Sequence, residues 1–359
     1  MRPVLVDKIA SVALRCGLRQ EVRVGDGYPC RAGDLIAVRL TTSKSTYNQL
    51  ELTTGRMSSL KQGDVIVGAL GHRNALQGYE GNVPSTLKTG DTLNLLNMGG
   101  VLGKCESFSP LVGPPHACEV LGQVLKFPDF QSRIGVPANI LDYSLPLTQE
   151  GSKFAPVIGV VGTSMNSGKT EACLTLVQQL VRLGLRVAAG KATGVSLRRD
   201  ILGMEDSGAE KTSIFTDFGV VTTSPETAPD VTFSILTTLQ SMNPDVIILE
   251  LGDGILGDYG VQEILGDPRV GEAMVSYVVA ASDPVGAWGA VSLLQDRYRI
   301  TPDVITGPAT DNKVGNRVIE RSTGIHCLNA RQSGPELAQF IYERSLNAKK
   351  EHSNHCARR

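Results

Sequence analysis

The sequence predicts an α/β fold with helices on both faces of a mainly parallel sheet, preceded by a small all-β domain. Up to about residue 150, short β-branched runs alternate with Gly-Asp turns, which is typical of all-β domains. After residue 156, strand-sized apolar runs alternate with helical stretches, which is typical of a parallel sheet. Residues 145–156 are polar with flanking prolines and are the expected linker between these two patterns.

Three similar segments organise the first half. RAGDLIAVRL, KQGDVIVGAL and KTGDTLNLL each predict a tight turn followed by a strand, because glycine permits the turn backbone and aspartate bonds to it. A barrel and a sandwich both fit this pattern. The Gly- and Pro-rich stretch LNMGGVLGKCESFSPLVGPPH predicts irregular loops. His72, Arg73 and Tyr79 either line a ligand pocket or lie in a solvated loop.

The composition is that of an ordinary globular protein with about two domains. Of its 359 residues, 41% are hydrophobic, and 35 Lys and Arg nearly balance 36 Asp and Glu. The formal charge of -1 provides no field that would attract nucleic acid or an anionic membrane, so we expect neither as a partner. The apolar runs are too short for a membrane span or a signal peptide, and we expect a cytoplasmic protein. The sequence leaves open whether the protein is a homodimer.

The 7 cysteines are scattered along the chain without a CxxC pair. This pattern favours reduced thiols over a disulfide framework. Pairs such as His116 with Cys118 have no second pair of ligand residues at the spacing of a zinc site. We therefore interpret them as packing residues.

The second half begins with a strand, a glycine-rich turn, a helix and a second strand. The helix has apolar residues at Leu174, Val177, Leu180 and Val181. Further strands are expected within residues 246–251, 277–281, 303–307 and 324–329. We therefore predict an all-β domain over residues 1–150, an α/β domain over 156–347 and a disordered tail over 348–359, with ligands at the carboxyl ends of the parallel strands.

The strongest chemical signal is the turn GTSMNSGKT, residues 162–170, between the first strand of the second half and its helix. Backbone N–H groups and the positive end of the helix can hold the phosphates of a nucleotide there. Lys169 reaches the outer phosphates, so we expect it to be exposed to ligand, and the Thr170 hydroxyl is an oxygen ligand for Mg²⁺. The expected phosphate-binding residues are Gly162, Thr163, Ser164, Asn166, Ser167, Gly168, Lys169 and Thr170.

The spacing of this turn departs from GxxxxGK[ST], because Thr163 stands where the first glycine is usual. GT followed by four residues and then GKT resembles dethiobiotin synthetase and the amidoligases of cobyrinic acid synthesis, a branch of P-loop enzymes. GKATG is similar to their KPVxSG, with Ala192 in place of proline, and TTSPETAP to their TSP segment. LELGDG is similar to their VEGAGG. The resemblance covers about residues 156–330, and LGDGILGDYG is also similar to the P-loop family that includes D-glutamate N-acetyltransferase.

The resemblance implies two metal-binding carboxylates, Glu250 in LELGDG and Asp206 in MEDSGA. The residues themselves also favour Glu250, because it follows the buried run VIIL, and a buried carboxylate is costly without a cation or a donor. Asp253 and Asp200 are the alternatives. Lys191, which ends the second strand and is expected beside the first, is suited to steady a substrate carboxylate, a carbamate or an acyl phosphate.

The resemblance also suggests that DVITGPATDN reads the nucleotide base, with Thr306, Asp311 and Asn312 as candidates. Asn and Asp at a turn are equally good helix caps. Arg198 and Arg199 either recognise a larger acidic substrate or form an exposed basic pair.

Three functions fit these residues. The first is an enzyme that uses ATP and Mg²⁺, with Lys169 and Lys191 as catalytic residues, to activate a carboxylate or a carbamate and form a C–N bond on a small acidic or amino-acid-like substrate. The second is an N-acyltransferase in which the same turn holds the phosphates of acyl-CoA. The third is a nucleotide-gated switch or a metal-insertion chaperone. The resemblance favours the first.

Overall fold

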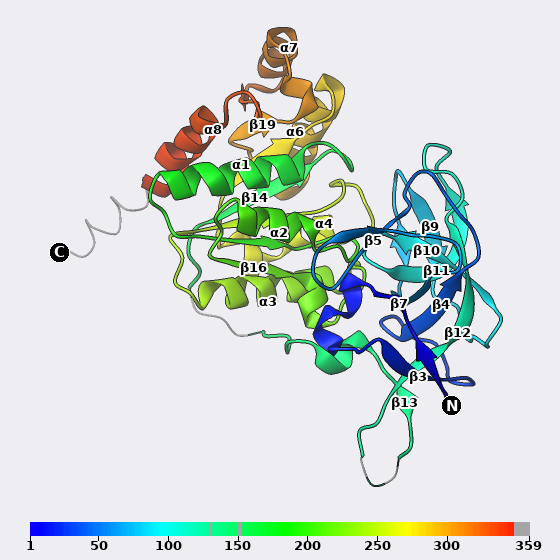
Figure 1. The fold of residues 1–359 in the computed structure, drawn as a ribbon. Helices are drawn as coiled ribbons and strands as arrows, with labels where there is room; N and C mark the ends of the chain where they lie inside the picture. The colour runs from blue at the N-terminus through cyan, green and yellow to red at the C-terminus, as the bar shows by residue number, and fades with distance from the viewer. Residues whose placement is uncertain (130, 132, 150–152, 348–359) are drawn as a thin grey trace. The chain divides into compact units, whose positions relative to one another are not determined.

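The computed structural model describes residues 1–129, 131, 133–149 and 153–347, so the predicted tail lies outside the described residues (Figure 1). None of the described helices is long and apolar enough to span a membrane. The chain forms two compact units. Unit 1 comprises Met1–Pro146, Val195–Arg199 and Phe215–Thr223, and unit 2 comprises Leu147–Gly194, Asp200–Ile214 and the chain from Ser224 onward.

Unit 1 is built on a closed β-barrel, one of the two architectures that the sequence allowed. Strand β12 (His116–Lys126) pairs with β4 (Leu35–Leu40), which pairs with β7 (Val65–Leu70). β7 runs parallel to β11 (Val101–Phe108), and β10 (Thr92–Asn97) pairs with both β11 and β12. These pairings form a ring, so the five strands share one interior and leave no open edge among themselves.

Shorter elements complete unit 1. Two strands extend the sheet beyond β12, and two extend it beyond β11. The remaining strands are β1 (Arg2–Leu5), β2 (Lys8–Ile9), β3 (Glu21–Gly25), β5 (Gln49–Glu51), β6 (Met57–Ser59), β8 (Arg73–Asn74), β9 (Tyr79–Asn82) and β13 (Val136–Pro137). The 3₁₀ helices are η1 (Ser11–Cys16), η2 (Ile140–Tyr143) and η3 (Phe215–Phe218).

The three Gly-Asp segments form turns of one kind, as the sequence predicts. At each turn the Asp side chain accepts a hydrogen bond of 2.8 Å from the backbone N–H three residues earlier. The preceding glycines have φ values of +87°, +94° and +91°, which would strain a residue with a side chain. The pairs are Gly33-Asp34, Gly63-Asp64 and Gly90-Asp91, and the barrel strands β4, β7 and β10 follow them.

Two predictions for this half are wrong. Residues 101–108 form β11 instead of a loop, because the glycines there permit close packing: a Cβ on Gly103 would lie 2.8 Å from Leu96 Cδ1. Arg73 and Tyr79 are buried instead of lining a pocket or a solvated loop, whereas His72 is exposed. The Arg73 guanidinium lies 5.7 Å from the ring centroids of both Tyr47 and Tyr79, so the three side chains pack together.

Unit 2 contains a seven-stranded sheet in the order β16-β15-β17-β14-β18-β19-β20, and every neighbouring pair is parallel. The predicted fold class is confirmed. The strands are β14 (Val157–Gly162), β15 (Val187–Lys191), β16 (Lys211–Ile214), β17 (Val246–Glu250), β18 (Met274–Ala280), β19 (Val304–Thr306) and β20 (His326–Cys327). The expectation that the second strand, β15, lies beside the first, β14, is wrong, because the apolar strand β17 pairs with both and separates them.

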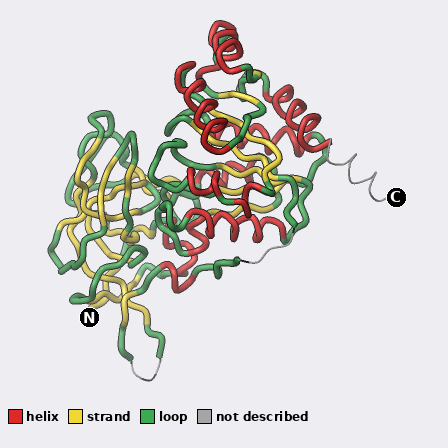
Figure 2. Tube along the Cα trace, turned by 180° about the vertical axis from the view of Figure 1, so that it is seen from behind, coloured by secondary structure: helices red, strands yellow, loops and turns green. Residues whose placement is uncertain are grey.

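Helices cover both faces of this sheet, as Figure 2 shows in red around the yellow strands. Ile158 and Val160 of β14 share a core with Leu176 of α1 and with side chains of α8. A Cβ on Gly190 of β15 would lie 2.9 Å from Ile235 of α3 on the other face. The helices are α1 (Lys169–Arg182), α2 (Arg199–Asp206), α3 (Ala228–Gln240), α4 (Val261–Gly266), α5 (Pro268–Gly271), α6 (Pro284–Tyr298), α7 (Lys313–Thr323) and α8 (Gly334–Ile341), with a 3₁₀ helix η4 (Pro308–Thr310) and a π-helical turn η5 (Tyr342–Asn347).

Burial along α1 yields a stability prediction. Leu176 is fully buried in the core, whereas Leu183 at the end of the same helix is 47% exposed. Leu176→Ala should lower the free energy of unfolding by about 2–5 kcal/mol, because it removes apolar contacts and leaves a cavity. Leu183→Ala should change it by less than about 0.5 kcal/mol. Urea denaturation of both variants checks this, and equal losses would contradict the packing described.

Candidate functional site

The candidate site is the turn between β14 and α1. Asn166 and Gly168 have positive φ values of +60° and +96°, and α1 begins at Lys169 directly after them. The first N–H groups of a helix have no acceptor within the helix. Together with the positive end of the helix dipole, they make this turn suited to bind an anion.

Lys169 lies within the turn and is buried, with 5% of its surface exposed. Its Nζ donates a hydrogen bond to the Ser164 carbonyl at 2.8 Å, so the side chain folds back over the turn. The expectation of an exposed lysine is therefore wrong. Burial lowers the pKa of the ammonium group, and the nearby carboxylates of Glu250 and Asp253 oppose this effect.

The next residue connects the turn to the sheet. The Thr170 hydroxyl donates a hydrogen bond of 3.1 Å to Oε1 of Glu250, the last residue of β17. Glu250 is 2% exposed, and its Oε2 is buried without a hydrogen-bond partner among the described residues. Burial raises the pKa of this carboxyl, and Lys191 is the strongest influence in the opposite direction. The structure thus brings together the predicted residues Lys169, Thr170, Lys191 and Glu250.

Sheet register explains why Lys191 belongs to this cluster although β15 does not touch β14. Lys191 pairs in register with Glu250, and Glu250 pairs with Val160. Residues paired across parallel strands point to the same face of the sheet. The Lys191 ammonium forms an ion pair with Asp200 of α2, and both side chains are nearly buried. The ion pair thus holds the first turn of α2 at the carboxyl end of β15.

The two candidate acids of α2 occupy different places. Asp200 lies in the first turn of the helix, where it pairs with Lys191 and raises the pKa of Glu250. Asp206 is exposed at the other end of α2. Asp206 follows Asp200 by six positions, which is about 9 Å along the helix axis. The structure therefore brings Asp200 into the cluster in place of the predicted Asp206.

Close backbone packing surrounds the turn. A Cβ on Gly254 would lie 2.9 Å from the Thr163 carbonyl, and one on Gly252 would lie 2.3 Å from the Thr193 carbonyl. Asp253, between these glycines, has a φ of +68° and is buried. The segment LGDG thus lets the loop after β17 pass directly over both neighbouring loops. The two glycines of LELGDG were the sequence signal for this contact.

The segment DVITGPATDN, residues 303–312, which the resemblance suggested as the reader of the nucleotide base, also contacts the turn. A Cβ on Gly307, which follows β19, would lie 2.3 Å from the Ser167 carbonyl. Asn312 caps α7, since its Oδ1 accepts hydrogen bonds of 3.0 Å from the N–H groups of Val314 and Gly315. Asp311 is exposed and accepts a hydrogen bond from the side chain of Asn329. Thr306 is buried, and its hydroxyl accepts a hydrogen bond from the Ala330 N–H.

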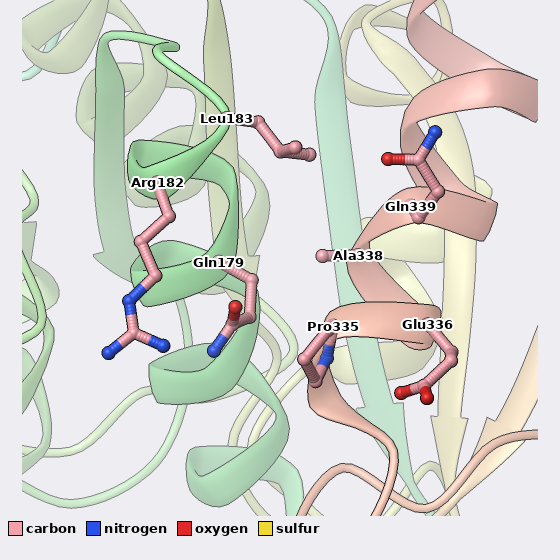
Figure 3. Close-up of a pocket in the computed structure, with 7 residues that line it drawn as sticks. All are labelled: Gln179, Arg182, Leu183, Pro335, Glu336, Ala338 and Gln339. Atoms are coloured by element: carbon pink, nitrogen blue, oxygen red, sulfur yellow. The ribbon is translucent and has the colours of Figure 1, made fainter.

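A pocket of about 380 Å³ lies elsewhere, between the C-terminal part of α1 and α8 (Figure 3). Gln179, which lines it, follows Lys169 by ten residues, or about 15 Å along the helix. This pocket is therefore separate from the turn at residues 162–170. Its lining residues are Gln179, Arg182, Leu183, Pro335, Glu336, Ala338 and Gln339.

Comparison with known proteins gives partial structural alignments only. No protein-family model and no curated protein matches this chain. A DUF1611 family protein from Anabaena variabilis aligns with a TM-score of 0.40 and 13% identity, over 55% of this chain and 62% of its own. The signal recognition particle receptor FtsY from Elizabethkingia anophelis in complex with GDP aligns with a TM-score of 0.37 and 16% identity, over 53% of this chain and 61% of its own. The matched part thus spans less than two thirds of either protein.

The bond between Thr170 and Glu250 yields a prediction about stability. Thr170→Val keeps the side-chain shape but removes the donor to a buried carboxylate, so the free energy of unfolding should fall by about 1–3 kcal/mol. Thr175→Val, on the same helix, removes a 3.3 Å bond to the Ala330 carbonyl and should cost about 0.5 kcal/mol. Urea denaturation without added nucleotide measures both losses, and a smaller loss for Thr170→Val would contradict the assigned contact.

Proposed function

We propose that unit 2 binds a nucleoside triphosphate together with Mg²⁺ and activates its outer phosphate toward a small acidic acceptor. The observation that carries this proposal is the convergence of Lys169, Thr170 and Glu250 at one uncapped helix start. At such a turn, a phosphate requires a cationic side chain. Its Mg²⁺ counter-ion requires oxygen ligands, such as a hydroxyl and a buried carboxylate.

The lysine supports the phosphate assignment. Lys169 is buried, and its Nζ donates to the neutral carbonyl of Ser164. A phosphate oxygen is a stronger acceptor for an ammonium group, because charge-assisted bonds are about twice as strong as neutral ones. A triphosphate that enters the turn therefore gains the ammonium group of Lys169, while the N–H groups at the start of α1 hold the adjacent oxygens.

The residues also fit Mg²⁺ that arrives with the nucleotide. The orphaned, buried Oε2 of Glu250 is an oxygen donor without a partner among the described residues, and the hydroxyl of Thr170 lies beside the same carboxylate. Within the described ranges, no three His, Cys, Asp or Glu side chains form a preformed metal centre. Mg²⁺ commonly uses one or two carboxylates and completes its shell with phosphate and water. When bound, it neutralises charge on the phosphates.

Lys191 supports an acidic acceptor. Its ammonium lies at the carboxyl end of β15, in register with Glu250, and is held by Asp200. There it can orient a carboxylate or a carbamate, an oxygen of which attacks the terminal phosphorus and displaces the nucleoside diphosphate. An amine that then attacks the acyl phosphate forms the C–N bond and releases phosphate. This is the ATP-dependent ligase or carboxylase that the sequence resemblance favours.

Binding experiments test this proposal against its alternatives. Calorimetric titration with ATP, GTP and acetyl-CoA, each with and without Mg²⁺, should show Mg²⁺-dependent binding of a triphosphate. Binding of acetyl-CoA alone would instead indicate the acyltransferase. Binding of a triphosphate without turnover on any amino or carboxylic acid would indicate the nucleotide-gated switch.

Lys169→Ala should weaken triphosphate binding by about 10- to 100-fold, because it removes a charge-assisted bond to phosphate. Lys88→Ala is the matched control, since Lys88 is an exposed lysine of unit 1. Calorimetry gives both affinities, and thermal melting verifies that both variants are folded. Equal affinities would remove the turn from the binding site.

Glu250→Gln should abolish the additional thermal stabilisation that Mg²⁺ gives in the presence of ATP. Without ligands its melting temperature should fall, because the substitution leaves the buried ammonium groups of Lys169 and Lys191 without this carboxylate, so the Mg²⁺ increment is measured relative to the variant's own ligand-free value. Differential scanning fluorimetry with ATP, with and without Mg²⁺, measures both effects. If the Mg²⁺ increment persists, Asp253 becomes the preferred ligand.

A further inference from the structure

Helix α6 is apolar on two opposite faces. Its inner face consists of the buried residues Ala287, Ala290, Val291 and Leu294. On its outer face, Val285 and Trp288 lie about one turn apart and are 74% and 53% exposed. A helix at the surface of a protein normally presents polar residues to water, whereas a helix that is apolar all round is normally buried. The outer face of α6 is therefore suited to contact with another apolar surface.

The same face carries no charge. Between Asp283 and Asp296 the sequence has no charged residue. The centres of protein interfaces are depleted of charged residues, and a charged partner needs opposite charges across the contact. Nucleic acid and strongly acidic or basic peptides find no such charges on α6. The partner that fits this face is an uncharged, apolar protein surface.

Leu256 adds a further exposed apolar side chain near α6. It lies in the loop after β17 and is 66% exposed. A Cβ on Gly254 of this loop would lie 2.9 Å from the Thr163 carbonyl, and one on Gly286 of α6 would lie 3.5 Å from the Thr163 side chain. The loop and the first turn of α6 therefore meet at the same residue, so their exposed apolar side chains belong to one region of unit 2.

Gly289 provides a second, independent observation on α6. Glycine destabilises a helix interior relative to alanine, so a glycine there calls for a packing reason. Gly286 has such a reason in its contact with Thr163. A Cβ on Gly289 would meet no atom within 4 Å, and its φ is not positive, so nothing in the described part of the chain requires glycine at this position. The outer face of α6 thus has a hollow directly beside Trp288.

A projection beside a hollow makes this face complementary to itself. Rotation about a twofold axis brings the projection of each copy to the hollow of the other, as in the isologous interfaces of C2 dimers. Tryptophan is among the residues that most often dominate the binding energy of an interface. We propose that this protein is a homodimer in which the α6 helices of two copies pack together, with Trp288 of each copy against Gly289 of the other. The inference does not depend on the proposed function.

Dilution tests the dimer directly. One helix face is smaller than a standard interface of about 800 Å² per partner, so we expect reversible association with a Kd on the order of 10 µM. Sedimentation velocity between about 1 and 300 µM should therefore show the mass rise from that of one chain to that of two. A protein that stays monomeric over this whole range would overturn the proposal.

Tryptophan fluorescence shows whether α6 forms the interface. Trp288 is the only tryptophan of the chain, so the emission spectrum reports on this side chain alone. Its emission should shift to shorter wavelength over the concentration range in which the mass doubles, because the indole ring leaves water. Association without such a shift would also overturn the proposal.

Two variants test the contact between Trp288 and Gly289. Trp288→Ala should weaken association by about 30-fold or more, because it removes the anchor of the interface. Gly289→Gln fills the hollow and should weaken association by at least about tenfold, because the added side chain overpacks the contact. Glutamine is a better helix former than glycine, so the melting temperature of Gly289→Gln at concentrations where the unmodified protein is monomeric should not fall. A folding defect would lower it.

Leu183→Ala and Gly271→Gln are the matched controls. Leu183 is an exposed apolar side chain at the end of α1, and a Cβ on Gly271 at the end of α5 also meets no atom within 4 Å. Both variants should dimerise like the unmodified protein. If Gly289→Gln dimerises equally well, the two copies meet through another surface, and the proposal is overturned.

Discussion

The burial of one carboxylate, that of Glu250, organises the candidate site. The apolar run before Glu250 places β17 in the centre of the sheet. Glu250, the last residue of this strand, is therefore buried between the elements that surround the strand. A carboxylate in that place needs donors or cations, because water does not reach it. Thr170, Lys191 and Lys169 supply them from α1 and β15. The start of α1 and the end of β15 are therefore both tied to β17.

Close backbone packing gives the site its shape. Gly252, Gly254 and Gly307 follow different strands, and a side chain on any of them would collide with a neighbouring loop. Parallel strands end at one edge of the sheet, so the loops that follow them compete for the same space. Glycines let these loops pass within van der Waals contact, and the turn at residues 162–170 is thereby enclosed by backbone on two sides.

The barrel unit is organised by a repeated turn. Three turns of one geometry start three of the five ring strands, and closure of the ring leaves those strands without an open edge. The unit also contains two segments that follow strands β15 and β16 of the other unit. Arg198 and Asp217 join these segments to each other. Each of these segments thus belongs to the barrel unit, although the strand before it belongs to the parallel sheet.

The sequence by itself determined most features that depend on neighbours along the chain, whereas it predicted the strand β11 as a loop. Turn chemistry predicted β4, β7 and β10, and GKT at the junction of a strand and a helix predicted the turn around Lys169. Strand-length apolar runs predicted every strand of the parallel sheet except the more polar β16. These signals are local, because a turn, a helix start or a buried strand is specified within a few residues.

Only the tertiary structure decided which distant residues meet. In the sheet, β17 separates β15 from β14. The register between β15 and β17 nevertheless places Lys191 beside Glu250. The length of α2 separated Asp200 from Asp206, and no spacing in the sequence distinguishes these two acids. Whether Arg198 is free or paired likewise depends on Asp217, a partner from another segment. Sequence patterns specify what a segment forms, whereas packing between segments sets the distances on which a binding site depends.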